Sequence, residues 1–340
     1  MTPKFTFSSI SLAHGGGGKM TGRLIRDMIL PRLDRGKLGA LPDSVVLSGF
    51  GEKIAFTTDS FVVSPIFFPG GDIGSLSVHG TCNDLSCSGA RPAYLSVGLI
   101  LEEGFPVEEL ARILDSMSEA ADASSIEIVT GDTKVTPKGA TDKIFINTAG
   151  IGLVQPAAQL NPSRIVPGDA IIVSGPVGNH GMAVMLSRAE FSFDFEVKSD
   201  SANVWPIVEQ LLKLEEGLKF LRDPTRGGLS ATLNEIASLT NFTVSVDEAF
   251  IPVAPAVSAA AEILGVNPLE AANEGRIVAV IDHREIDHAL DMLKDCPLAT
   301  GACFIGTITS ERKPRVVIKT RIGGSRILAE PSGELLPRIC

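Results

Sequence analysis

The sequence predicts a mixed α/β (α+β) protein with two domains, and three observations support this fold class. The chain has 340 residues, whereas a single domain usually has about 100–200. β-Rich segments alternate with segments of helical periodicity through both halves of the chain. A stretch with three prolines, residues 155–168, separates the halves. We therefore expect an N-terminal domain over residues 1–155, a linker over 156–168, a C-terminal domain over 169–330 and a tail over 331–340.

The elements of the N-terminal half follow from periodicity and from residues typical of helix ends. Asp72 is a suitable N-cap, and Pro106 stands at a first-turn position of the next helical segment. The expected helices are residues 21–33, 72–89 and 106–121, and the expected strands are residues 45–47, 54–58, 93–101, 126–130 and 143–154.

The C-terminal half repeats the alternation. The expected helices are residues 182–188, 204–214, 228–239 and 286–293, and the expected strands are residues 170–174, 242–246, 276–281 and 315–318. Residues 331–340 have neither period. Ten such residues could extend over about 30 Å, so we expect a flexible tail that carries Cys340 into a distant pocket.

Composition excludes several classes of protein. The formal net charge is −10 and the basic residues are scattered, which argues against nucleic-acid binding. No stretch approaches the roughly 18–20 apolar residues of a membrane span. The N-terminus lacks the charged-then-apolar pattern of a secretory signal. We expect a soluble cytoplasmic protein that does not bind membranes.

The five cysteines do not form a disulfide or zinc pattern, because their number is odd and their spacing irregular. Cys82 and Cys87 are expected on one helix, too far apart to be bridged. Together with Cys296 and Cys303 they are expected to be small buried side chains. Cys340 differs because no residue follows it to bury it, and we expect it to be a working thiol.

A glycine run precedes Lys19 without matching the phosphate-binding P-loop, since Ala13 and Met20 occupy positions that the P-loop pattern gives to Gly and to Ser or Thr. The backbone N–H groups of such a run could still surround phosphates, with Lys19 as a point charge. A flexible loop is the alternative. The candidate glycines are Gly16, Gly17 and Gly18.

Three aspartates of the N-terminal half could hold metal. Asp59 is expected at the end of a strand, Asp84 on a helix and Asp132 near a strand end. Mg²⁺ takes one or two carboxylates together with phosphate oxygens and water. Each residue alone is more often a cap or turn former, but together with the glycine run they favour a nucleotide site.

Two motifs of the C-terminal half could join that site. Arg226 stands in a glycine-containing loop immediately before a helix, where free N–H groups meet anions. Glu274 offers a carboxylate at a loop tip before a strand. Either segment could equally be a plain turn.

These motifs, taken in order, resemble the HypE family of nickel–iron hydrogenase maturation proteins, in the superfamily of aminoimidazole ribonucleotide synthetase and selenophosphate synthetase. The resemblance covers essentially the whole chain, and its family-specific element is the terminal Pro-Arg-Ile-Cys. The motifs are residues 14–19, 59–60, 80–85, 131–135, 223–229, 273–275 and 337–340.

The resemblance implies a homodimer whose N-terminal sheets form a barrel near the ATP site, with the C-terminal domain over it. It implies ATP-dependent dehydration of an S-carbamoyl group on Cys340 to an S-cyanate (thiocyanate), the source of the cyanide ligands of the hydrogenase iron. The carbamoyltransferase HypF would deliver the carbamoyl group, and the HypC–HypD complex would receive the product.

The site residues implied for this reaction fall into three groups. The nucleotide would be bound by Gly16, Gly17, Gly18, Lys19, Asp59, Asn83, Asp84, Asp132 and Arg226. Mg²⁺ would be bound by Asp59, Asp84 and Asp132. Catalysis would use Cys340 as carrier, Glu274 as the base that accepts the N–H protons, and Lys134 for proton transfer or for binding the carbamoyl oxygen.

Two other interpretations stay open from the sequence. The chain could be a non-catalytic ATP-binding scaffold whose tail thiol only carries a group. It could also be another ATP-dependent member of the superfamily, such as selenophosphate synthetase, which places its reactive cysteine or selenocysteine near the N-terminal glycine run. Here the first cysteine is Cys82.

Overall fold

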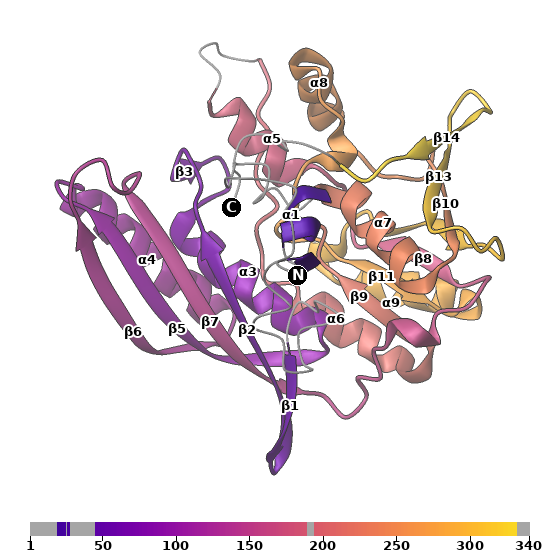
Figure 1. Cartoon of the computed structure of the whole chain (residues 1–340), viewed down its shortest axis with the longest axis horizontal. Coiled ribbons are helices and arrows are strands. Elements are labelled where there is room, and N and C mark those ends of the chain that lie inside the picture. Colours follow the sequence, from indigo (N-terminus) through magenta and orange to yellow (C-terminus); the bar gives the residue numbers. More distant parts are fainter. Residues whose placement is uncertain (1–18, 25, 28–44, 189–193, 332–340) are drawn as a thin grey trace, which may run out of the picture.

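The computed structural model describes residues 19–24, 26–27, 45–188 and 194–331. They form two sheet-containing units that lie side by side, the N-terminal one on the left of Figure 1 and the C-terminal one on the right. No helix of the described residues is long and apolar enough to cross a membrane.

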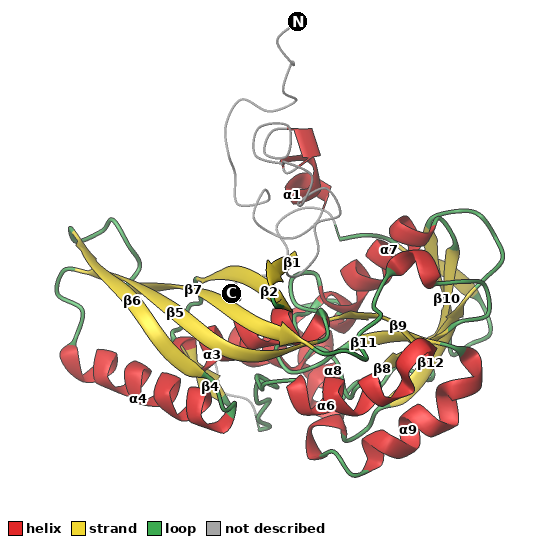
Figure 2. Cartoon of the chain, turned by 90° about the horizontal axis from the view of Figure 1, so that it is seen from below, coloured by secondary structure: helices red, strands yellow, loops and turns green. Residues whose placement is uncertain are grey.

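The N-terminal unit is a five-stranded sheet in which only the β5–β6 pair is parallel. Across the sheet its strands are β1 (Val45–Phe50), β2 (Glu52–Phe61), β7 (Ile144–Val154), β5 (Ala90–Glu102) and β6 (Glu127–Thr136). Helices α3 (Ile73–Cys87) and α4 (Val107–Ala123) cover one face of it (Figure 2). A two-residue pair, β3 (Phe67–Phe68) and β4 (Gly71–Asp72), precedes α3.

Helix α3 is the central element of the N-terminal unit. Asp72 caps it, because the Oδ1 atom of Asp72 accepts from the backbone N–H groups of Gly74 and Ser75 at 2.8 and 3.0 Å. Gly74 permits close packing on α4, since a Cβ atom there would lie 2.3 Å from the carbonyl oxygen of Ile113. Most of α3 is buried, so its polar residues face other parts of the protein and not water.

The C-terminal unit is a mixed seven-stranded sheet. Across it lie β14 (Ser325–Leu328), β13 (Arg315–Lys319), β10 (Thr243–Asp247), β12 (Cys303–Ile308), β8 (Ala170–Val173), β11 (Val278–Ile281) and β9 (Leu218–Arg222). Its helices are α5 (Asn179–Leu186), α6 (Trp205–Leu211), α7 (Gly228–Thr240), α8 (Pro255–Leu264) and α9 (Ile286–Lys294).

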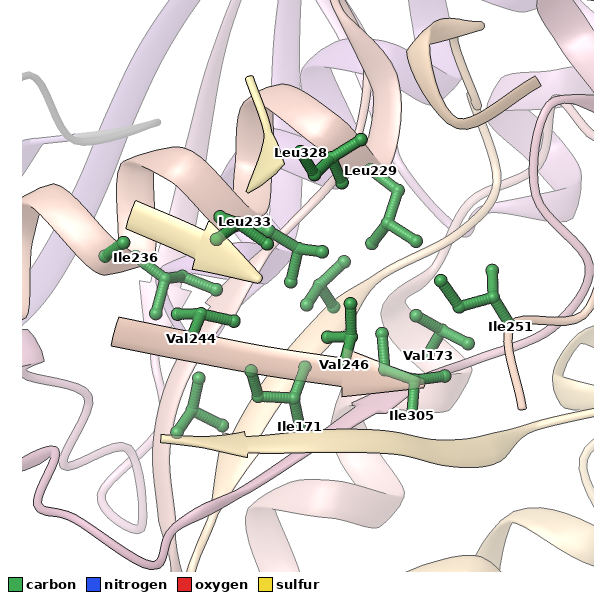
Figure 3. Packing of buried hydrophobic residues seen from close by; sticks show 14 of the residues in the cluster. Ile171, Val173, Leu229, Leu233, Ile236, Val244, Val246, Ile251, Ile305 and Leu328 are labelled. Carbon is green, nitrogen blue, oxygen red and sulfur yellow. The ribbon is translucent and has the colours of Figure 1, made fainter. Parts of the chain in front are cut away.

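Helices cover both faces of the C-terminal sheet. Leu229, Leu233 and Ile236 of α7 pack with Val244 and Val246 of β10 on one face (Figure 3). A second cluster of buried residues, which includes those of α6 and α9, packs on the other face. Every residue of β8 and β11 is buried, because strands in the middle layer of such an arrangement are covered on both faces.

Most predicted elements are confirmed to within a few residues. The predicted helix over residues 21–33 begins as α1 (Lys19–Leu24), but its second half lies outside the described residues. Strands β9, β12 and β14 and helix α8 were not predicted. The prediction that Asp59 ends a strand is wrong, because β2 continues to Phe61.

The cysteines of the described part lie as expected with one exception. Cys82, Cys87, Cys296 and Cys303 are free thiols, and the first three are buried. Cys303 is only half-buried, because it lies on β12 near the surface. Gly16, Gly17, Gly18 and Cys340 lie outside the described residues.

Candidate active site

Four carboxylates from four separate segments meet where the two units adjoin. Asp59 comes from β2, Asp84 from α3, Asp223 from the loop after β9, and Glu274 from the loop before β11. The charges of Asp59 and Asp223 raise the pKa of Asp84 and Glu274, and Asp59 also raises that of Asp223, so the four carboxyls share one electrostatic environment. We call these four residues the acidic cluster.

Burial and neighbouring negative charges disfavour the ionised carboxylates of the acidic cluster. Burial raises the pKa of Asp84 well above its ordinary value, and the charges of Asp223 and Asp59 raise it further. A hydrogen bond of 2.9 Å from the Oγ1 atom of Thr57 to Oδ2 of Asp84 opposes the shift. Burial likewise raises the pKa of Asp223 to about 6. A bound cation would relieve this repulsion.

Arg226 is a positive group that acts on all four carboxylates of the acidic cluster. It lowers the pKa of Asp59, Asp84, Asp223 and Glu274, against the larger effect of burial. It is exposed and stands just before α7, whose first turn has no side-chain cap. An exposed guanidinium beside uncapped N–H groups is suited to bind phosphate.

Glu274 is held by its backbone while its side chain keeps an unpaired oxygen. Its N–H donates to Oδ1 of Asp200 at 3.1 Å, and its carbonyl oxygen accepts from Nδ2 of Asn83 at 2.9 Å and from the N–H of Ala202 at 3.2 Å. The residue is 2% exposed, and its Oε1 atom has no hydrogen-bond partner among the described residues. Burial raises the pKa of this carboxyl well above its ordinary value, and Asp223 and Asp59 add to the effect. These contacts fix the backbone of Glu274 and leave one oxygen of its carboxyl available to accept a proton.

The contacts of Asn83 do not support its predicted role in nucleotide binding. Its Nδ2 donates to the carbonyl oxygens of Ala202 and Glu274, and its Oδ1 accepts from the N–H of Val204 at 2.9 Å. The side chain is fully buried. All of these partners belong to the C-terminal unit, so Asn83 joins the two units.

The structure does not bring Asp132 and Lys134 to the acidic cluster of the same chain. Both lie on β6 with side chains 72% and 74% exposed, and they form an ion pair of 3.7 Å. Asp132 of β6 pairs with Gly98 of β5, Gly98 pairs with Asn147 of β7, and Asn147 pairs with Ser60 of β2. Asp132 is therefore three strand spacings of roughly 4.8 Å each from the neighbour of Asp59. Strand alternation places Asp132 on the face opposite to Asp59. Within one chain the strand order therefore separates Asp132 from Asp59 and Asp84, and the metal site shared by these three residues stays a prediction.

The arrangement of the carboxylates limits how a metal ion could be bound. Within the described ranges, no group of three His, Cys, Asp or Glu side chains is arranged to hold a metal ion. Mg²⁺ that is bound together with a nucleotide needs only one or two carboxylates. Asp59, Asp84 and Asp223 fit that requirement as oxygen donors, because Asp223 is buried, the other two are half-buried, and the charges of Asp59 and Asp223 raise the pKa of Asp84.

Two residues of this region, Asp223 and Asp200, were not predicted as site residues. Asp223 belongs to the same motif as Arg226. Its position directly after a buried strand could have predicted it as a site residue. Asp200 had no signal, because it lies in a polar segment without regular structure. Lys19, which the sequence assigned to the nucleotide, begins α1 with an exposed side chain.

The comparisons with known proteins agree with this architecture. Residues 42–154 match the family model of the AIR synthase related protein, N-terminal domain, and residues 166–319 match that of the C-terminal domain. The chain is 45% identical to the carbamoyl dehydratase HypE of Cupriavidus necator, over 97% of this chain and 95% of that protein. It is 40% identical to the HypE of Escherichia coli, over 98% and 100% of the two chains.

Solved structures give the same relationship. A HypE in complex with ATP has a TM-score of 0.81 and 44% identity, covering 98% of this chain and all of that one. A HypE from a HypE–HypF complex has a TM-score of 0.86 and 43% identity, covering 91% and 99%. A thiamine monophosphate kinase from Aquifex aeolicus, with a TM-score of 0.59, 17% identity and coverage of 81% and 90%, shares the fold alone.

Two adjoining α/β units with a buried acidic cluster between them thus define a protein of the AIR synthase related family. Within that family the chain belongs to the HypE proteins, as its full-length identity of 40–45% to them shows.

Proposed function

We propose that this chain is an ATP-dependent carbamoyl dehydratase that converts an S-carbamoyl group on Cys340 into an S-cyanate for nickel–iron hydrogenase maturation. The observation that carries the proposal is Glu274, a rigidly held buried carboxyl with an unpaired oxygen beside three further carboxylates. Relatives of 40–45% identity that are named carbamoyl dehydratase HypE support it.

The reaction needs a better leaving group on the carbamoyl carbon. The carbamoyl oxygen attacks the γ-phosphorus of ATP, ADP leaves, and the nitrogen loses one proton. The C–O bond then breaks, phosphate departs, the second N–H proton is removed and the C≡N bond forms. A phosphate group, with a second pKa of about 6, leaves far more readily than hydroxide.

The residues of the chain divide this work. Glu274 accepts an N–H proton, and its high pKa makes it a stronger base than an ordinary glutamate. Arg226, with the N–H groups at the start of α7, holds phosphate. Lys19 and the N–H groups of Gly16, Gly17 and Gly18 bind the nucleotide. Asp59, Asp84 and Asp223 would hold Mg²⁺, which neutralises phosphate charge during phosphoryl transfer.

We also propose that the chain acts as a homodimer. Phe56, Ile151 and Tyr94 are cross-strand neighbours on the face of the N-terminal sheet that carries no helix, and they are 36–46% exposed. Covering such a face with a second copy buries apolar area.

The partners follow from the chemistry. HypF would deliver the carbamoyl group to Cys340, as the solved HypE–HypF complex of a relative supports. The HypC–HypD complex would receive the cyanide group.

The direct test uses the purified chain after carbamoylation of Cys340 by HypF. Incubation with Mg-ATP should remove the mass of one water molecule from the C-terminal peptide, with one ADP formed per cyanate. An unchanged carbamoyl adduct would contradict the enzyme and favour a thiol carrier.

A further inference from the structure

A segment without regular structure, residues 197–204, crosses from one unit to the other beside Glu274. The N–H of Ser199 donates to the carbonyl oxygen of Pro69 in the N-terminal unit at 2.8 Å. The N–H of Ala202 donates to Glu274, and Val204 donates to Asn83. We call residues 197–204 the strap.

Asp200 is the member of the strap that enters the interior. Its side chain is 1% exposed, and its Oδ1 atom accepts the N–H of Glu274 at 3.1 Å. Oδ2 lies 3.7 Å from Nε of Arg276, and Arg276 itself donates to the carbonyl oxygens of Pro176, Gly275 and Leu298. Burial raises the pKa of Asp200, so keeping this carboxylate inside the protein costs free energy.

Gly275 fixes the distance between the strap and the Glu274 loop. A Cβ atom at position 275 would lie 1.8 Å from the carbonyl oxygen of Asp200 and 3.1 Å from the nitrogen of Ala202. Only glycine permits this approach. The Glu274 loop thus packs against the backbone of the strap and is also hydrogen-bonded to the Asp200 side chain, which leaves it little freedom.

We propose that Asp200 is a positioning residue that fixes the Glu274 carboxyl at the reacting carbamoyl nitrogen, by holding the backbone N–H of Glu274 against the strap. The inference rests on the proposed role of Glu274 as the base.

Two variants of Asp200 distinguish the effect of its position from the effect of its charge. Asp200→Asn keeps an acceptor of the same reach at Oδ1 but removes the charge. Asp200→Glu keeps the charge but is one methylene longer, and so displaces the loop. Asp194→Asn, an exposed position just before the strap, is the matched control. Single-turnover dehydration of carbamoylated Cys340, ATP affinity by calorimetry and the melting temperature are measured for each.

We expect Asp200→Glu to slow dehydration on the order of 100-fold, as a displacement of about 1 Å does, with ATP affinity unchanged. We expect Asp200→Asn to stay within a factor of about three of the unmodified chain, because the geometry is kept. If Asp200→Glu does not fold, Asp200→Ala replaces it with the same expected loss.

Three results would overturn the inference: full activity of Asp200→Glu, an equal loss in Asp200→Asn, or a loss confined to ATP affinity. The unmodified chain is assayed alongside. If it forms no cyanate, the proposed function fails; if it does and the Asp200 variants match it, only the role of Asp200 fails.

Discussion

Asn83 of α3 donates from Nδ2 to the carbonyl oxygen of Glu274 over 2.9 Å, and this bond connects the N-terminal unit to the loop that carries the candidate base. The same amide also bonds Ala202 and Val204. A single buried side chain therefore holds both the strap and the Glu274 loop on α3. The junction of the two units and the candidate active site share this one residue.

Replacing Asn83 should destabilise that junction. Asn83→Ala leaves two carbonyl oxygens and one N–H group with a lost partner, which should cost about 2–4 kcal/mol of unfolding free energy. Urea denaturation measures the loss, and Glu209→Ala on the exposed side of α6 is the control, with little expected effect. A change of less than about 0.5 kcal/mol at Asn83 would contradict its role in joining the units.

Removing one carboxylate from the acidic cluster should stabilise the nucleotide-free protein. The pKa of Asp84 is higher in the folded than in the unfolded chain, so its contribution to stability falls as pH rises through and above about 4. Asp84→Asn keeps an acceptor for Thr57 and removes the repulsion, which should gain about 1–2 kcal/mol at neutral pH.

The same variant should lose the stabilisation that Mg-ATP gives. Thermal unfolding with and without Mg-ATP measures both effects. Asp291→Asn, an exposed residue of α9, should show neither. A lower melting temperature of nucleotide-free Asp84→Asn would show that the cluster is not repulsive.

Glu274→Gln should block dehydration without preventing ATP binding. The amide has nearly the same shape and keeps the backbone contacts, but it cannot accept a proton, so the rate should fall about 10²–10⁴-fold. In the unmodified chain the rate should rise with pH beyond the ordinary range of a glutamate, because the raised pKa keeps Glu274 protonated at lower pH.

Single-turnover kinetics together with calorimetry separate the two effects. Glu270→Gln, four residues earlier in the chain, is the control. Full dehydration by Glu274→Gln with intact ATP binding would assign the base to another residue.

His79 should make the stability of the protein depend on pH. Burial lowers its pKa to about 4 from the ordinary 6.5, and its Nδ1 atom lies 3.0 Å from Oγ of Ser201 in the strap. The unfolded chain binds this proton from pH 6.5 downward and the folded chain only near pH 4. Stability should therefore fall across that window, by up to about 3 kcal/mol.

His79→Gln should remove that part of the pH dependence, which denaturation at pH 7 and pH 5 measures. His288→Gln alters an exposed histidine and should leave the dependence as it is. An identical pH dependence in His79→Gln and the unmodified chain would show that His79 is not buried as a neutral ring.

The fold was predictable where the signals are local. Asp72 predicted the start of α3, and the capping hydrogen bonds confirm it. Strand β9 was not predicted because Lys219 interrupts its apolar pattern, and that lysine is buried only through its ion pair with Asp169 at 2.6 Å. Such a partner, fifty residues away in the chain, leaves no local pattern in the sequence.

The candidate site was predictable in part. The motifs around Asp59, Asp84 and Glu274 pointed to residues that the structure brings to one place. The contacts of Asn83 could not be predicted, because the backbone groups that its amide bonds lie more than 100 residues away in the chain. Asp132 was grouped with the other aspartates because sequence alone does not give the strand order, which separates β6 from β2 by two strands.

The central claim is that this chain dehydrates a carbamoyl group on its own terminal thiol. The most direct measurement is mass spectrometry of the C-terminal peptide after carbamoylation by HypF and a single turnover with Mg-ATP, with Cys340→Ala as the unmodifiable control. We expect the adduct on Cys340 to lose the mass of one water molecule as one ADP is formed. An adduct that keeps its full mass while ATP is bound would contradict the claim.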